Sequence, residues 1–337
     1  MNASALHWFR RDLRLTDNKA LSAALHHDDT VYCVFVFDTA ILDDLSRRTD
    51  RRVEFILHSL TELAAEIHAR GGGLIVLHGR AGEEVPRLAK RLGVSRVYTN
   101  RDYEPAAIAR DREVEQALND SGIAFLRSKD QVIWEQDEVL SKEGRPFTVF
   151  AAYRNAWLKR LPEADLAPAD DARPGGGRLA PPPPAGALPG GLPDLEGLGF
   201  EPTNLLQLPI RPGASGAEQA LQDFLPRMHA YREARNYPAI RGVSYLSVHL
   251  RFGTVSVRRL VNEALREGSD GARAWLDELI WRDFYFSILY QFPHVVGHAF
   301  RRDLEELPFT NRDDLFAAWK EGRTGFPLVD AAMRQLN

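Results

Sequence analysis

The first 128 residues alternate between short apolar runs and longer stretches with helical spacing. These runs are β-branched or apolar and have the lengths of strands, at residues 5–9, 30–37, 73–78, 95–99 and 123–127. Between them, apolar residues recur at intervals of three and four over 53–67, and 106–118 forms a further helical stretch. This alternation predicts a parallel sheet with helices on both faces. We therefore expect a doubly wound α/β domain over residues 1–130.

The composition changes sharply in the middle of the chain. Residues 162–212 are rich in proline and glycine, and the run PPPPAGALPGG is not expected to sustain a helix or a strand. We interpret residues 131–215 as an interdomain linker. Beyond Gly216 the pattern is helical throughout, which predicts an all-α domain over residues 216–337.

Composition and spacing argue against several classes of protein. The single cysteine, Cys33, cannot form an internal disulfide and lies in the probable strand core VYCVFVF. No leader and no apolar run of about 18 residues is visible, which favours a cytoplasmic protein. His294 and His298 are spaced like a metal-binding pair. However, Pro293 and Gly297 disfavour a rigid helix there and no third ligand is near, so we expect no metal site.

The longest uninterrupted helical pattern is WLDELIWRDFYFSILY, at residues 275–290. On a 3.6-residue period, five of its aromatic or charged residues are expected to share one face: Trp275, Glu278, Trp281, Arg282 and Tyr285. That face could be a surface stripe with an ordinary ion pair between Glu278 and Arg282, or it could line a cavity. The two tryptophans favour a cavity, because an exposed Trp without a partner wastes its apolar area.

A basic segment lies inside a protein whose net charge is -4. Residues 227–259 contain seven basic residues and one acid, Glu233, which gives a local charge of +6, and tyrosines are interleaved with them. Such a segment suits a polyanion that carries planar groups, either a nucleic acid or a dinucleotide cofactor. A solvated basic surface is the alternative. Ser244 and Ser247 lie near the start of a predicted helix, where they could bind phosphate or simply cap the helix.

Five separated segments resemble the photolyase and cryptochrome family, in order and with matching spacing. They are WFRRDLRLTDN, NRDYEPAAIARDREV, the block 231–253, WLDELIWRDFY and GRTGFPLVDAAMRQLN. The resemblance covers nearly the whole chain apart from the linker and is closest to the bacterial class I cyclobutane pyrimidine dimer photolyases. It implies an N-terminal α/β antenna domain and a helical domain that holds FAD. It also implies light-driven repair of UV-damaged DNA, with an electron passing from excited reduced FAD to a flipped-out pyrimidine dimer.

The resemblance further implies roles for individual residues. Tyr231 matches a tyrosine that contacts the flavin, and Trp275 matches the tryptophan beside the flavin. The loop that holds the FAD phosphates in the family matches the residues Val243, Ser244, Tyr245, Leu246 and Ser247.

The implied lesion site lies on the same predicted helix. Glu278 matches the acid that hydrogen-bonds the dimer, and Trp281 matches the stacking platform under it. Arg235 and Arg282 match basic residues at the flavin and DNA side, and Tyr285 completes the expected DNA-binding set.

Three departures from the family pattern affect the expected chemistry. Val243 stands where many relatives have Thr, so a hydroxyl contact to phosphate is lost. Phe309 stands where many relatives carry the outermost tryptophan of the electron relay. Ala106 and Ala107 replace an Asn-Glu pair of folate-binding relatives, which leaves a deazaflavin antenna, a flavin antenna or no antenna open.

The chain stops inside a helical pattern, GFPLVDAAMRQLN, without a capping glycine. We therefore expect a C-terminally truncated photolyase whose FAD site is incomplete, so that this chain binds FAD weakly or not at all. Relatives suggest a monomer, and no protein partner is evident. Two alternatives stay open, a cryptochrome-like blue-light photoreceptor that does not repair DNA and a non-catalytic fragment.

Overall fold

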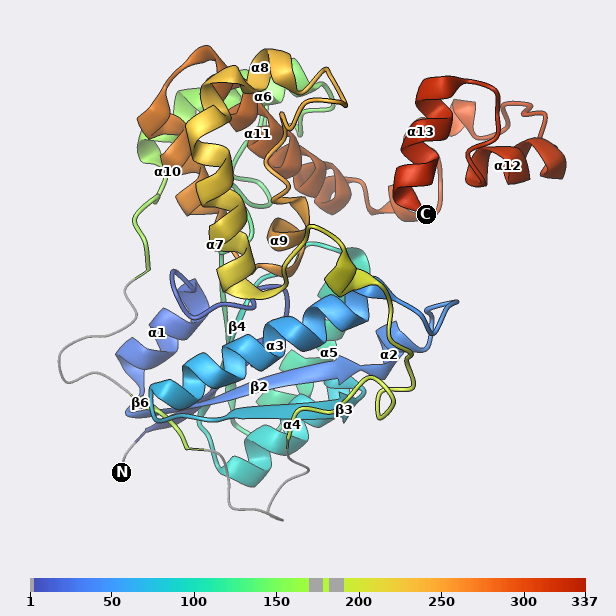
Figure 1. Cartoon of the computed structure of the whole chain (residues 1–337). Helices are drawn as coiled ribbons and strands as arrows, with labels where there is room; N and C mark the ends of the chain where they lie inside the picture. Colours follow the sequence, from blue (N-terminus) through green and yellow to red (C-terminus); the bar gives the residue numbers. More distant parts are fainter. Residues whose placement is uncertain (1–2, 170–177, 182–190) are drawn as a thin grey trace. The chain divides into compact units, whose positions relative to one another are not determined.

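The computed structural model describes residues 3–169, 178–181 and 191–337. Their contacts divide the chain into two units, the first ending at Pro293 and the second running from His294 to Asn337. The first unit contains a parallel sheet and a group of helices, and the second contains short helices only. Figure 1 shows the elements of both units.

The sheet has the strand order β3-β2-β1-β4-β5, and all of its pairings are parallel. The strands are β1 (Ser4–Phe9), β2 (Thr30–Asp38), β3 (Leu74–Gly79), β4 (Arg96–Asn100) and β5 (Ala124–Ser128). Each begins within one residue of its predicted start. The doubly wound α/β prediction is therefore confirmed.

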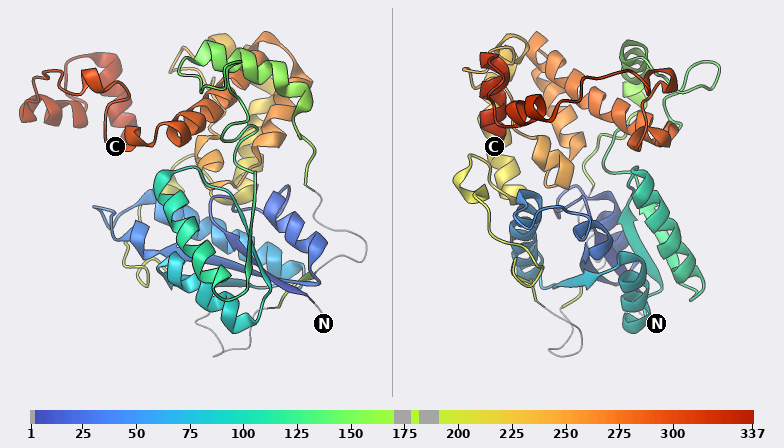
Figure 2. Two further views of the ribbon diagram at one scale, coloured as in Figure 1. Left: turned by 180° about the vertical axis from the view of Figure 1, so that it is seen from behind. Right: turned by 90° about the vertical axis from the view of Figure 1, so that its right-hand side faces the viewer.

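Helices cover both faces of this sheet. They are α1 (Lys19–His27), α3 (Arg51–Ala69), α4 (Ala81–Leu92) and α5 (Pro105–Asn119), with the short α2 (Thr39–Leu42) after β2. Alternate residues of one strand face opposite layers, so Cys33 of β2 packs with α1 and α3 while Val34 packs with α4 and α5. Seen from behind in Figure 2, α4 and α5 cover the face opposite α3.

The prediction that residues 162–212 form neither helix nor strand is wrong in part among the described residues, and most of the run PPPPAGALPGG lies outside them. Arg178–Leu179 forms β6, which pairs in parallel with Thr30 and Val31 of β2. This edge of β2 is free because β3 pairs only from Cys33 onwards. Further along, η2 (Leu205–Gln207) is a short 3-10 helix, and Thr203 N donates to Glu54 of α3 at 3.0 Å.

The helical part of the first unit has its own apolar core. Its elements are α7 (Gly213–Phe224), η3 (Leu225–Ala230), α8 (Tyr231–Ala234), α9 (Ser247–Phe252), α10 (Val257–Glu267) and α11 (Asp270–Gln291). The predicted helix 275–290 lies within α11, whose start is capped by the Ser269 hydroxyl, which accepts a hydrogen bond from Ala272 N at 3.1 Å. No helix in the described part of the chain is long and apolar enough to cross a membrane.

Part of the predicted linker packs into this helical core. The helix α6 (Phe150–Arg160), followed by η1 (Leu161–Glu163), contributes Tyr153 and Trp157 to it. The carboxylate of Asp283 in α11 accepts hydrogen bonds from Ile133 N at 3.0 Å and from Trp157 Nε1 at 3.0 Å. Burial nevertheless outweighs these bonds and raises the pKa of Asp283 to about 6.

A buried charge network joins the α/β layers to the helices. Arg258 of α10 contacts Asp130 and Asp17 at 2.8 Å each, and Arg14 contacts Asp130 at 2.7 Å. All four side chains are at most 7% exposed. Although burial favours the protonated acid, Arg14 and Arg258 lower the pKa of Asp130 to about 2. Close backbone packing adjoins the network, since a Cβ on Gly253 would lie 2.0 Å from the Arg11 carbonyl oxygen.

The second unit contains η5 (Arg302–Leu304), α12 (Asp313–Lys320) and α13 (Pro327–Leu336), while η4 (Pro293–Val296) spans the division. Asp330 orders the turn before α13 by accepting hydrogen bonds from Thr324 N at 2.7 Å and Gly325 N at 3.0 Å. His298 pairs with Glu305 at 2.5 Å. No group of three metal-ligating side chains occurs among the described residues.

We predict that Arg258→Met lowers the free energy of unfolding by about 3–5 kcal/mol, because it leaves buried Asp17 and Asp130 without that partner. Urea unfolding followed by circular dichroism measures the change. The matched control is Arg259→Met, whose pairing with Glu218 is about 40% exposed and is expected to cost less than about 1 kcal/mol. Equal losses in the two variants would contradict a dominant buried network.

We also predict a pH-dependent contribution from Asp283. Its ordinary pKa is 3.8 and its folded pKa is about 6, so the folded state retains the proton over that range and stability falls as pH rises through it. The unfolding free energy of the native chain minus that of Asp283→Asn should therefore decrease by up to about 3 kcal/mol between pH 4 and pH 7. A difference that is constant over this range, measured by urea unfolding at each pH, would be inconsistent with the raised pKa.

Candidate functional site

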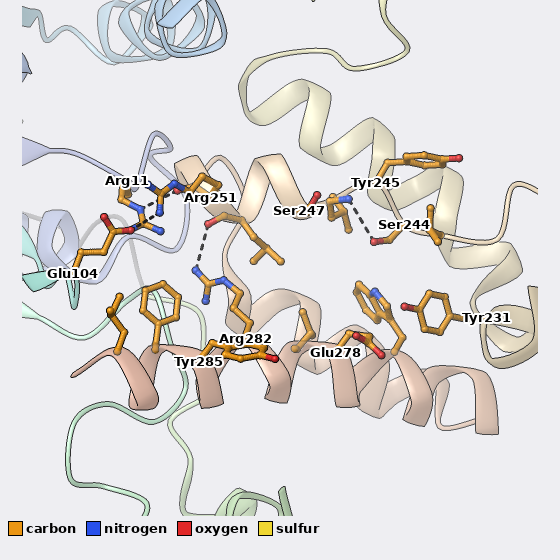
Figure 3. A pocket seen from close by; sticks show the side chains of 17 residues that line it. Arg11, Glu104, Tyr231, Ser244, Tyr245, Ser247, Arg251, Glu278, Arg282 and Tyr285 are labelled. Atoms are coloured by element: carbon orange, nitrogen blue, oxygen red, sulfur yellow. Dashed lines mark hydrogen bonds and ion pairs between the residues drawn. The ribbon is translucent and has the colours of Figure 1, made fainter. Parts of the chain in front are cut away.

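One cavity of about 620 Å³ lies inside the first unit, between α11, α8, the loop before α9 and the charged turn after β1. Figure 3 shows Ser244 and Tyr231 at one end and Arg11, Glu104 and Arg251 at the other. Of the predicted cofactor residues, the cavity is lined by Tyr231, Val243, Ser244, Tyr245, Leu246, Ser247, Trp275 and Arg282. We call this space the α11 cavity.

The helical period of α11 determines which of its side chains reach the cavity. The lining residues of this helix are spaced by one, three or four positions: Trp275, Glu278, Leu279, Arg282, Tyr285, Phe286 and Leu289. The opposite face, including Leu276, Ile280 and Phe284, is buried in the helical core. Four of the five residues predicted to share a face therefore line the cavity.

Trp281 is the fifth, and it does not line the cavity. Its indole stacks on Phe150 of α6, with ring centroids 3.6 Å apart and planes inclined by 6°. Tyr285 stacks beside it at 5.4 Å and 23°. Since Trp281 lies six residues after Trp275, it is rotated about 120° from that residue around the helix and reaches only the margin of the predicted face.

The ion pair between Glu278 and Arg282, which the sequence analysis considered, does not form. Glu278 instead pairs with Arg235, which follows α8, and the Arg235 guanidinium lies over the ring of Tyr231 with its central carbon 5.5 Å from the centroid. Arg282 donates to the carbonyl oxygens of Gln131 and Leu250. Removal from water lowers the pKa of Arg282 to about 10. The interpretation as a simple surface stripe is therefore wrong.

The loop 243–247 presents hydrogen-bond donors at the other wall. Tyr245 has φ +58, a left-handed conformation that turns neighbouring backbone groups to the same side. The backbone N–H groups of Val243, Ser244 and Tyr245 donate to no described residue. The N-cap residue of α9 is Leu246, which has no capping side chain, and the Ser244 hydroxyl accepts a long hydrogen bond of 3.4 Å from Leu246 N.

Sequence reasoning missed the charged end of the cavity. Glu104 lies between two guanidinium groups, 2.8 Å from Arg11 and 2.5 Å from Arg251. Phe286 lies between the guanidinium groups of Arg11 and Arg282, whose central carbons are 5.6 and 4.7 Å from its ring centroid. The signal in the sequence was the charged turn after the first strand, but its partners come from segments about 90 and 240 residues away along the chain.

Taken together, these walls suit an elongated ligand with a planar part and an anionic part. Trp275 and Tyr231 provide aromatic surface, and burial raises the pKa of Tyr231, which keeps it neutral. The loop provides free N–H groups and hydroxyls, which are donors suited to phosphate oxygens. Glu278 places a carboxylate on the same wall as Trp275.

Comparisons with known proteins agree over the whole chain. Residues 5–173 match the DNA photolyase family, and residues 275–337 match the FAD binding domain of DNA photolyase. A deoxyribodipyrimidine photo-lyase of Synechococcus is 35% identical over all of this chain and 70% of its own length. The enzyme of the same name from Halobacterium salinarum is 34% identical over 98% of this chain and 70% of its own length.

Solved structures share the fold. A bacterial class III photolyase from Agrobacterium tumefaciens superposes with a TM-score of 0.85 at 28% identity, covering all of this chain and 69% of that protein. An archaeal photolyase from Sulfolobus tokodaii, solved with two FAD molecules, gives 0.74 at 29% identity over 99% of this chain and 70% of that protein. A Synechocystis cryptochrome, 24% identical with a TM-score of 0.84 over 99% of this chain and 71% of that protein, shares the fold. On these matches, the chain belongs to the DNA photolyase family.

Proposed function

We propose that the α11 cavity serves light-driven repair of cyclobutane pyrimidine dimers in DNA, with FAD as the cofactor. The observation that carries the proposal is that aromatic rings, free phosphate-type donors and the carboxylate of Glu278 line a single cavity. The 35% identity to deoxyribodipyrimidine photo-lyases supports the same chemistry.

The residues present fit FAD in their donor chemistry. The diphosphate suits the N–H groups and hydroxyls of 243–247, since two serines remain although Val243 offers no side-chain donor. The planar ring suits the aromatic wall of Trp275 and Tyr231. When bound and reduced, the flavin supplies the photoexcited electron that splits the dimer.

The chain's own side chains would bind and orient the lesion. Glu278 is about 40% exposed and would hydrogen-bond the dimer at the edge of the cavity, where the Arg235 ion pair holds its carboxylate in place. Trp281 and Tyr285 would stack against the flipped-out bases, and such stacking is worth about 1–3 kcal/mol per base. Arg282, tied to two carbonyl oxygens, would contribute fixed positive charge on the flavin and DNA side.

For a second, light-harvesting chromophore we propose a chemical type and no individual compound. Ala106 and Ala107 in α5 carry no hydrogen-bonding side chains, so a folate antenna is the least favoured choice and a deazaflavin or a flavin is preferred. The second FAD of the Sulfolobus tokodaii photolyase supports a flavin as one option.

The remaining assignments are proposals of the same kind. The antenna domain would comprise 1–130, the linker 131–215, and the cofactor and DNA domain 216–337. A monomer that acts on chromosomal DNA would work in the cytoplasm, at the bacterial nucleoid.

We predict that adding the chain to FAD quenches flavin fluorescence only weakly, with the low affinity that the sequence analysis expects of this chain. Trp275→Leu should weaken FAD binding between about 5-fold and 150-fold, because it removes a stacked aromatic worth about 1–3 kcal/mol while keeping an apolar side chain in the core. Tyr237→Ala is the control, since Tyr237 is exposed and does not line the cavity. Equal affinity for FAD in Trp275→Leu and the native chain would count against the assignment of Trp275.

For the lesion, we predict that Trp281→Ala weakens binding to dimer-containing DNA between about 5-fold and 150-fold, by loss of a stacking surface. Affinity for the same duplex without a dimer should not change, because the flipped base is absent. Gel-shift titrations of both duplexes measure this. If both affinities are unaffected, Trp281 is not the platform, and the rival function of a photoreceptor without repair gains support.

A further inference from the structure

The indole ring of Trp281 packs against an aromatic side chain of α6. One face of the indole is covered by Phe150, whose ring is nearly parallel at 3.6 Å between centroids. Tyr285 is also stacked on the indole, at 5.4 Å and 23°, so a planar ligand can reach Trp281 only at the face opposite Phe150 and beside Tyr285. Neither Phe150 nor its helix was connected with DNA binding in the sequence, since they lie about 130 residues away in the predicted linker.

Three side chains on α6 attach that helix to α11. Phe150 stacks on Trp281, Arg154 one turn later pairs with Asp277 at 2.5 Å, and Trp157 two turns later donates to Asp283 at 3.0 Å. These positions are four and three residues apart, so they share one face of α6. The helix therefore has one apolar, one ionic and one hydrogen-bonded attachment to α11.

The ring of Phe284 packs edge-on against both Phe150 and Trp281 and restrains the angle between those two rings. It is 5% exposed and meets Phe150 at 5.9 Å and 65°, and Trp281 at 5.7 Å and 70°, both edge-on. Because Phe150 covers one face of the Trp281 indole and Phe284 packs against it edge-on, the indole is restricted to few rotamers before a ligand binds. Ordering a free side chain on binding opposes binding, so this arrangement favours stacking.

We propose that Phe150 is a positioning residue for base stacking: it holds the Trp281 ring flat and presents the opposite face, with Tyr285, to an unpaired base. Tyr285 is 62% exposed and lines the α11 cavity, so its ring extends the aromatic surface of Trp281 towards that cavity. The inference rests on the proposed function, because it takes the stacked group to be a base of the lesion.

A double-mutant cycle tests the inference on the full chain. Phe150→Leu should weaken binding to dimer-containing DNA by about 2- to 10-fold, the value of an aromatic pair. It should not change affinity for undamaged duplex. Phe150→Tyr, which keeps the ring, should restore native affinity. In a Trp281→Ala background, Phe150→Leu should have no further effect, because the ring that it positions is gone.

The outcomes separate this inference from the proposed function. Equal losses in the native and Trp281→Ala backgrounds, or a loss on undamaged duplex, would show a general structural effect and overturn the inference. So would an unchanged affinity in Phe150→Leu when Trp281→Ala alone is weakened. If Trp281→Ala alone is unaffected, the proposed lesion platform fails as well. Should Phe150→Leu not fold, judged by circular dichroism, Phe150→Met takes its place in the cycle with the same criteria.

Discussion

The arrangement of the first unit depends on the buried contact of Arg258 with Asp130 and Asp17. Two guanidinium groups and two carboxylates that are almost fully removed from water require each other, because any one left alone would be an uncompensated buried charge. The network joins the turn after β1 and the end of the sheet to α10. Since Arg11 lies on that turn and lines the α11 cavity, the charged end of the cavity is built only when the two halves are joined.

The other constraint is the geometry of a single helix. Side chains on one face of α11 line the cavity while its other face is buried, so the register of α11 sets which groups meet there. Hydrogen bonds from segments of the predicted linker hold α11 in this register. Gln131 accepts from Arg282, and Ile133 and Trp157 donate to Asp283, which places two successive residues of α11 under separate hydrogen bonds. The linker is thus partly structural.

Local sequence patterns were sufficient to predict much of the fold and many of the residues that line the cavity. The five strands were predictable because each is a short apolar run, and α11 because nothing interrupts its period. The helix α4 was not predicted, and it carries Pro86 in its interior. Tertiary pairings could not be read from spacing either: β6 exists only because β2 has a free edge, and Glu278 pairs with Arg235 across 43 residues. The rotation of Trp281 away from the cavity follows from the helical period, but its stacking on Phe150 does not.

The central claim is the proposal that this cavity serves light-driven repair. The most direct measurement is recovery of pyrimidine absorbance in a dimer-containing oligonucleotide incubated with the chain, added FAD and a reductant, in blue light and in the dark. We expect recovery in the light only, with the dimer restored to separate pyrimidines. If flavin and dimer-containing DNA are both bound and no recovery follows illumination, the cavity binds its ligands without repairing DNA and the central claim is wrong.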